Sequence, residues 1–334
     1  MENKKLILAI DFNNVCFANY YGNKLYNSKG NNINAIKGFF FKLKMLKETF
    51  NPDYIILASD LSRERTFRRK LYKKYKAQRK PTDEDIVFQM KYISQLVSLL
   101  GYKILNNETY EADDILGMIA KYGSDNNMET VIISSDRDLY QLINDNTFIM
   151  SPRNGGEVVD TAYLVEKYRL MPYQWVDLKT LQGDASDNIP GIRGIGETTA
   201  LKLMQEYDSI DGIYDSIKDI KPSVQKLLRA GIDTIDLTKQ LVTIVTDYNL
   251  IGLNEDMFKR DTIYPRECID VILDLEIPSL INVFNYSLFD KPIFIDQSKL
   301  PGSNETFMLP WWGNLIWLIL KLLKVILQKL LSEM

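Results

Sequence analysis

The stretch TVIISSDRD, residues 130–138, decides the fold class because a short apolar run ends abruptly in two aspartates. Two earlier runs have the same form: LILAID ends at Asp11 and YIILASD ends at Asp60. Short apolar runs of this kind are typical of buried strands in a parallel sheet. Helical patterns near 33–48, 84–100 and 111–123 alternate with strand candidates near 5–10, 54–59, 102–105 and 130–134. The alternation predicts an α/β fold, with a mostly parallel sheet and helices on both faces.

Acidic residues follow these predicted strands, at the sheet edge where open α/β folds place their ligands. The helical segment YEADDILGMIA adds Glu111, Asp113 and Asp114, and GDASDN adds a further acidic pair. A lone aspartate after a strand is more often a helix N-cap, which would account for Asp114 or Asp138 alone. So many acids together require cations, and with no histidine in the chain oxygen ligands favour Mg²⁺ or Mn²⁺. Two such ions about 4 Å apart would suit hydrolysis of a phosphodiester.

A basic and aromatic stretch, SRERTFRRKLYKKYKAQRKP at 62–81, follows Asp60 directly. Basic side chains neutralise phosphates, and aromatic rings stack on bases whatever the sequence. The alternative is a solvated basic helix without a ligand. Its position beside the acids favours an arm that brings a nucleic-acid backbone to the metal ions.

A glycine-rich turn, IPGIRGIGETTALKLM, fits a helix–hairpin–helix element around Gly191, Gly194 and Gly196. Glycine permits left-handed backbone and close approach of a phosphate to main-chain N–H groups. Such contacts bind phosphate without reading sequence.

Composition sets broad limits on the protein class. The net charge of −3 hides the basic segment, so it does not exclude a polyanionic partner. Two distant cysteines, Cys16 and Cys268, indicate reduced thiols. The N-terminus lacks the features of a secretory signal, so we expect a cytoplasmic protein. The predicted domains are a catalytic domain at 1–170, a helical region at 171–295, a linker at 296–309 and an apolar tail at 310–334.

These blocks resemble the 5′-nuclease superfamily, which includes the 5′→3′ exonuclease domain of bacterial DNA polymerase I, phage 5′-exonucleases and flap endonucleases. The strongest are TFRRKLYKKYKAQRKP, YEADDILG, ISSDRDLYQLI and LQGDASDNIPGIRGIGETTA. The resemblance implies a PIN-like fold, a helical arch at about 62–92 and a helix–three-turn–helix element. It implies metal-dependent cleavage of DNA at 5′ flaps, nicks or 5′ ends, including RNA primer removal in replication or repair. Because no polymerase follows, we expect a stand-alone bacterial or phage enzyme.

The resemblance also assigns residues by motif. Lys76 and Arg79 would contact the scissile phosphate, with Arg68 assisting and Tyr75 stacking on a base. Tyr72 and the three turn glycines would join the DNA-binding surface, and K⁺ is expected near 190–196. The metal-site acids would be Asp11, Asp60, Glu111, Asp113, Asp114, Asp136, Asp138, Asp184 and Asp187.

Two features depart from the family pattern. Phe12 stands where relatives usually have a small residue, beside Asp11. The tail at 310–334 carries three tryptophans and, on a helix, a narrow polar stripe. Its lysines argue against spanning a bilayer. An interfacial helix on a membrane surface suits it best, with a partner's groove, self-association or packing on its own protein as alternatives.

Two other functions fit parts of the pattern. A DNA-junction protein would use the arch and the hairpin without cutting, but it would have no need for so many acids. A PIN-like ribonuclease would share the acids, whereas the arch and the hairpin favour flapped or nicked duplexes.

Overall fold

The computed structural model describes residues 4–61, 64–152 and 156–291, and within them the chain forms one six-stranded sheet. The strand order is β3-β2-β1-β4-β5-β6, and only β6 runs antiparallel to its neighbour. The predicted α/β class and mostly parallel sheet are therefore confirmed. The strands are β1 (Leu6–Asp11), β2 (Tyr54–Ala58), β3 (Lys103–Leu105), β4 (Glu129–Ile133), β5 (Thr147–Met150) and β6 (Val158–Val159).

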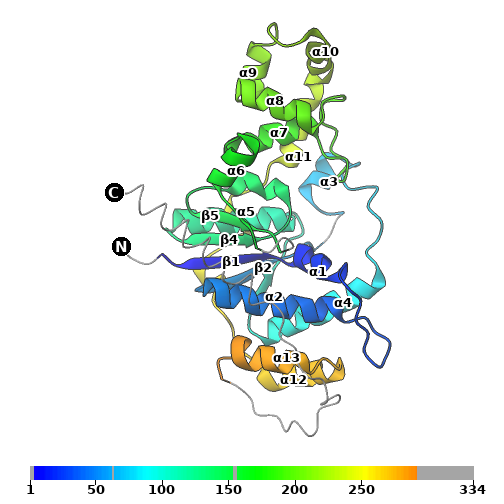
Figure 1. Cartoon of the computed structure of the whole chain (residues 1–334), viewed down its shortest axis with the longest axis vertical. Helices are drawn as coiled ribbons and strands as arrows, with labels where there is room; N and C mark the ends of the chain where they lie inside the picture. The colour runs from blue at the N-terminus through cyan, green and yellow to red at the C-terminus, as the bar shows by residue number, and fades with distance from the viewer. Residues whose placement is uncertain (1–3, 62–63, 153–155, 292–334) are drawn as a thin grey trace.

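Helices cover both faces of the sheet (Figure 1). One face carries α5 (Ala112–Asp125), and the other carries α1 (Phe12–Tyr20), α2 (Asn34–Phe50) and α4 (Glu84–Leu99). Side chains of β1 alternate between the two cores: Ile7 and Ala9 join the first, whereas Leu8 and Ile10 join the second. A strand buried on both faces must be apolar throughout, which explains the unbroken run LILAI before Asp11.

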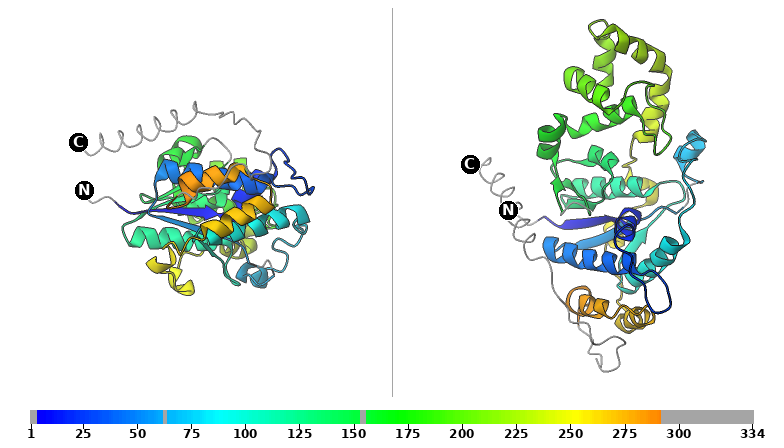
Figure 2. Two further views of the ribbon diagram at one scale, coloured as in Figure 1. Left: turned by 90° about the horizontal axis from the view of Figure 1, so that it is seen from below. Right: turned by 45° about the vertical axis from the view of Figure 1, so that its right-hand side comes forward.

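A helical region extends from the α5 face, and Figure 2 shows that it makes the molecule elongated. At the opposite end, α12 (Pro265–Asp274) and α13 (Ser279–Val283) pack beneath α2 and α4. The remaining α-helices are α3 (Phe67–Leu71), α6 (Thr161–Tyr168), α7 (Trp175–Gln182), α8 (Glu197–Tyr207), α9 (Ile210–Asp215), α10 (Pro222–Gly231) and α11 (Ile235–Val242). Short 3₁₀ turns are η1 (Arg137–Leu142), η2 (Pro172–Gln174), η3 (Ile232–Thr234), η4 (Tyr248–Ile251) and η5 (Glu255–Met257), and η6 (Phe284–Leu288) is a π-helix.

Acids of the predicted site also start the helices that follow the strands. Asp11 caps α1 by accepting a hydrogen bond from Asn14 N at 3.0 Å. Glu111 is the N-cap of α5, where Asp114 completes a capping box. Asp136 caps η1. The N-cap role considered for such acids is real, and it fixes their backbone where strands and helices meet.

The glycine-rich turn between α7 and α8 is only partly as expected. Gly191 has a φ of 54° and Gly194 a φ of 92°, so the left-handed backbone is confirmed at both. A Cβ at Gly191 would lie 2.4 Å from Gly183 N, so the two chain segments approach too closely for a side chain. Gly196 differs, because its φ is −93° and its Cβ position is open, and its place in the DNA-binding surface stays a prediction.

The predictions for the linker at 296–309 and the tail at 310–334 lie outside the described residues. Among the helices that the structure describes, none is both long and apolar enough to cross a membrane.

Candidate active site

A cavity of about 450 Å³ opens at the carboxyl edge of the sheet, where the predicted acids converge. Lys76 and Arg79 line it together with the acids, and Phe17, Val87 and Met90 form an apolar wall. The charged lining suits a phosphate, and the apolar wall suits the attached sugar or base. The acids in the lining are Asp11, Asp60, Glu111, Asp113, Asp136 and Asp187.

Asp11, at the end of β1, is the centre of this group. It is 6% exposed, and Ser134 Oγ donates to its Oδ2 at 2.8 Å. Burial raises the pKa of Asp11 to about 7, and the negative charges of Asp60 and Asp136 add to the rise. Burial also raises the pKa of Asp113 well above its ordinary value, with Asp136 and Asp11 contributing. Ionising these acids together is costly unless a cation joins them.

A second group of acids lies beside the cavity and is held by Lys179 of α7. Its Nζ contacts Asp138 at 2.7 Å and Asp184 at 3.1 Å. Burial and the charge of Asp136 raise the pKa of Asp138 to about 6, although Lys179 opposes the shift. Sequence reasoning missed Lys179; the only signal was a lysine five residues before Asp184.

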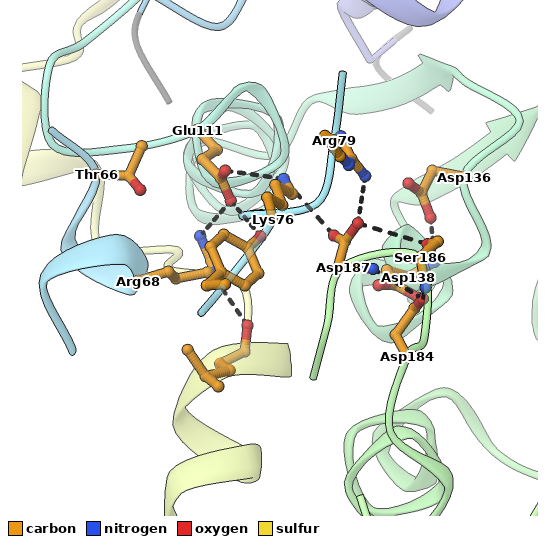
Figure 3. A network of polar contacts seen from close by, with 12 residues as sticks. Thr66, Arg68, Lys76, Arg79, Glu111, Asp136, Asp138, Asp184, Ser186 and Asp187 are labelled. Carbon is orange, nitrogen blue, oxygen red and sulfur yellow. Dashed lines mark hydrogen bonds and ion pairs between the residues drawn. The ribbon is translucent and has the colours of Figure 1, made fainter. Parts of the chain in front are cut away.

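Lys76 and Arg79 reach the acids from the chain between α3 and α4 (Figure 3). Lys76 Nζ contacts Glu111 at 2.8 Å and Asp187 at 3.6 Å, and Arg79 pairs with Asp187. Burial tends to raise the pKa of Glu111, but Lys76 and Arg68 outweigh it and hold that pKa below its usual value. The predicted convergence of both cations on the site is therefore observed.

Arg68 and Asp114 form a buried ion pair, which differs from the predicted roles of both. The Arg68 guanidinium donates to both Asp114 oxygens, at 2.6 and 2.8 Å, and to Glu111 at 3.2 Å. Asp114 is fully buried and Arg68 is 3% exposed. Neither side chain lines the cavity, because the fork of the arginine and the carboxylate satisfy each other in the interior. Asp114, which was expected to be a metal ligand, and Arg68, which was expected to assist the phosphate contact, thus hold α3 against α5.

Tyr72 and Tyr75 also lie elsewhere than expected. Tyr75 is 4% exposed and its hydroxyl donates to Glu111 at 2.7 Å. Both rings pack in a small cluster with Ile189 and Leu241. Burial against these apolar side chains is more favourable than exposure to water, so the Tyr75 ring is not available to stack on a base here, whereas Tyr72 is only partly buried.

Phe12 lies outside the lining of the cavity. It is 4% exposed and packs edge-on against Phe39 at 5.9 Å, within the core on the α2 face. The core therefore accommodates the large side chain at this position. The K⁺ expected near 190–196 stays a prediction.

The residues present fit hard divalent cations. Within residues 4–61, 64–152 and 156–291, no three acids or thiols are gathered closely enough to hold an ion as they stand. The fit comes from the donor chemistry: carboxylate oxygens with raised pKa values share one polar cavity. Oxygen donors of this kind suit Mg²⁺ or Mn²⁺.

Comparisons with known proteins agree with this geometry. The model of the 5′-3′ exonuclease N-terminal resolvase-like domain matches residues 6–169, and that of the C-terminal SAM fold matches residues 170–263. The chain belongs to the 5′-3′ exonuclease family. The predicted superfamily and enzyme class, a 5′ nuclease, are confirmed.

Curated relatives of this 5′-3′ exonuclease are DNA polymerases. The thermostable DNA polymerase I of Thermus thermophilus is 34% identical over 94% of the chain, and that of Thermus aquaticus is 35% identical over 94%. DNA polymerase I of Bacillus subtilis is 35% identical over 78% of the chain. The chain spans 38% of the length of the two Thermus enzymes and 31% of the Bacillus enzyme.

Solved structures share the fold of this 5′-3′ exonuclease. T5 D15 protein co-crystallised with metal ions has a TM-score of 0.62 at 19% identity, covering 81% of this chain and 99% of its own. The catalytic core of Rad2 in complex with DNA substrate has a TM-score of 0.54 at 14% identity, covering 80% and 86%.

The buried ion pair predicts opposite effects for two isosteric substitutions. Asp114→Asn should lower the free energy of unfolding by about 3 kcal/mol, because it removes the paired carboxylate of the buried Arg68 and leaves Glu111 as the acid in contact with it. Asp136→Asn should leave that free energy unchanged or higher, because it removes a repulsive charge beside Asp11. Urea unfolding of both variants in EDTA checks this. Equal stability of the two variants would remove Arg68–Asp114 as a structural pair.

The raised pKa of Asp11 predicts a pH dependence of stability. Its folded pKa, about 7, lies above the ordinary 3.8, so its protonation stabilises the fold fully below about pH 4. That contribution is lost as the pH rises through 7. In EDTA at pH 8, the free energy of unfolding of Asp11→Asn should therefore be higher than that of the wild type by on the order of 4 kcal/mol, and the gap should close towards pH 4. An equal gap at both pH values would contradict the prediction.

Proposed function

We propose that this chain is a divalent-metal-dependent, structure-specific 5′ nuclease that removes 5′ flaps and 5′-terminal nucleotides from DNA. One observation carries the proposal: the acids Asp11, Asp113 and Asp136 and the cations Lys76 and Arg79 line the same cavity. A non-catalytic junction-binding protein would gain nothing from acids whose crowding raises their pKa values.

The roles of the residues follow from their positions. Asp11, Asp60, Asp113 and Asp136 would hold Mg²⁺ or Mn²⁺, with Asp138 and Asp184 available beside them. Bound there, the ions would supply Lewis-acid stabilisation of the charge that develops on the phosphate. Lys76 and Arg79 would bind the scissile phosphate and stabilise the same charge.

The hairpin between α7 and α8 supplies the proposed duplex contact. The first N–H groups of α8 follow Gly196, whose Cβ position is open, so a phosphate can approach the backbone. We further propose a role in replication or repair, including RNA primer removal, in the bacterial cytoplasm, since the curated relatives are bacterial DNA polymerases.

Cleavage of a 5′-labelled flap in Mg²⁺, Mn²⁺, Ca²⁺ or EDTA tests the proposal. Wild type should cut near the flap junction in Mg²⁺ and Mn²⁺, and Asp11→Ala and Asp136→Asn should not cut while still binding the flap in Ca²⁺. Lys76→Ala should slow the single-turnover rate more than it weakens binding, because its charge acts in the transition state.

Two outcomes would contradict this function. Tight flap binding without cutting in any metal would favour the junction-binding protein. Faster cutting of single-stranded RNA than of the DNA flap would favour a PIN-like ribonuclease.

A further inference from the structure

The chain between α3 and α4 runs against the loop that follows α7. We name residues 74–79 the arch strand and residues 184–188 the acidic loop. Gln78 of the arch strand donates through Nε2 to the backbone oxygens of Ala185 at 3.2 Å and Ser186 at 2.8 Å. The Gln78 side chain thereby holds one end of the contact between the arch strand and the acidic loop.

The acidic loop returns a matching contact to the other end of the arch strand. Asn188 Nδ2 donates to the backbone oxygen of Lys74 at 2.7 Å. Between these bonds, Lys76 N donates to the backbone oxygen of Asp187 at 2.9 Å. All the acceptors are backbone carbonyls, so the contacts do not depend on the charge of the acids.

These bonds lie next in the chain to Lys76 and Arg79, the two cations that line the cavity and that Figure 3 shows. Lys76 has a φ of 52°, a left-handed backbone that a lysine adopts only when its surroundings impose it. The bond from Asn188 precedes this residue and the bond from Gln78 follows it. The bend turns the Lys76 side chain into the cavity, where it is mostly buried.

We propose that Asn188 and Gln78 are positioning residues that clamp the arch strand onto the acidic loop and so aim Lys76 and Arg79 at the scissile phosphate. The inference rests on the proposed 5′-nuclease function and deepens it. The acidic loop belongs to the helical region beside the hairpin, so the clamp joins that region to the cavity. Neither amide is required to touch substrate.

The test uses Gln78→Ala and Asn188→Gly, alone and together, in the full chain. Asn188 has a φ of 59°, so glycine removes the amide without straining the backbone. Single-turnover cleavage of a pre-bound flap should fall on the order of tenfold in the double variant, the rate equivalent of three neutral hydrogen bonds at the low end of their usual contribution. The dissociation constant of the flap in Ca²⁺ should change by less than about twofold, because phosphate binding elsewhere is untouched.

Two matched controls distinguish the positioning of Lys76 and Arg79 from a general effect of losing hydrogen bonds. Gln225 Nε2 donates to Lys218 O at 3.2 Å and Ile220 O at 2.7 Å, so Gln225→Ala removes the same kind of contact away from the cavity. Asn127 has a φ of 55°, so Asn127→Gly makes the same change in another left-handed turn. Both should cut at the wild-type rate.

A double-mutant cycle with Lys76→Ala decides whether the clamp acts through the lysine. In that background, removing both amides should cost clearly less than tenfold, because only Arg79 is left for the clamp to aim. A full tenfold loss in that background, an unchanged rate in the double variant, or weaker binding at an unchanged single-turnover rate would each overturn the inference. A wild-type protein that fails to cut would overturn the proposed function first, and the inference with it.

Discussion

Repulsion among buried carboxylates is the constraint on which the rest of this structure depends. Parallel strands and the start of α5 bring Asp11, Asp113 and Asp136 to one sheet edge, where burial raises the pKa values of Asp11 and Asp113. A fold chosen for stability alone would not gather them. Cations from outside the sheet compensate the negative charge of the acids: Lys76 and Arg79 lie on one side, and Lys179 lies on another.

Residues of the basic stretch have different roles, depending on whether they are buried. Arg68 lies inside and ties α3 to α5 through Asp114, and Tyr75 donates to Glu111 from a buried position. Lys76 and Arg79 reach the cavity. One basic and aromatic stretch therefore supplies both the buried side chains that stabilise the site and the two cations proposed to bind phosphate. The buried Arg68 and Tyr75 contact Glu111 and so hold it where it contacts Lys76.

The sheet was predictable because a strand buried on both faces must be apolar, so β1, β2 and β4 are visible as runs in the sequence. The edge strand β3 was predicted from its place between two helical patterns. The strands β5 and β6 were not predicted, since their four and two residues give too short a pattern. Three of the six acids of the cavity, Asp11, Asp60 and Asp136, were predictable from their place at or after the end of a strand.

The orientation of individual side chains was not predictable. Asp113 and Asp114 are neighbours in one helical turn, yet one faces the cavity and the other a buried arginine. Local sequence cannot tell which way each points, because the answer depends on the distant Arg68. Lys179 was missed for the same reason: its partners Asp138 and Asp184 come together only in the fold.

The central claim is that the cavity acids form a divalent-metal centre. Anomalous scattering from crystals soaked in Mn²⁺ tests it most directly, because it locates the ions without relying on activity. Manganese peaks in the cavity between Asp11, Asp113 and Asp136, absent in Asp11→Asn crystals, are the result we predict. Manganese bound only elsewhere on the protein, with this cavity empty, would contradict the account.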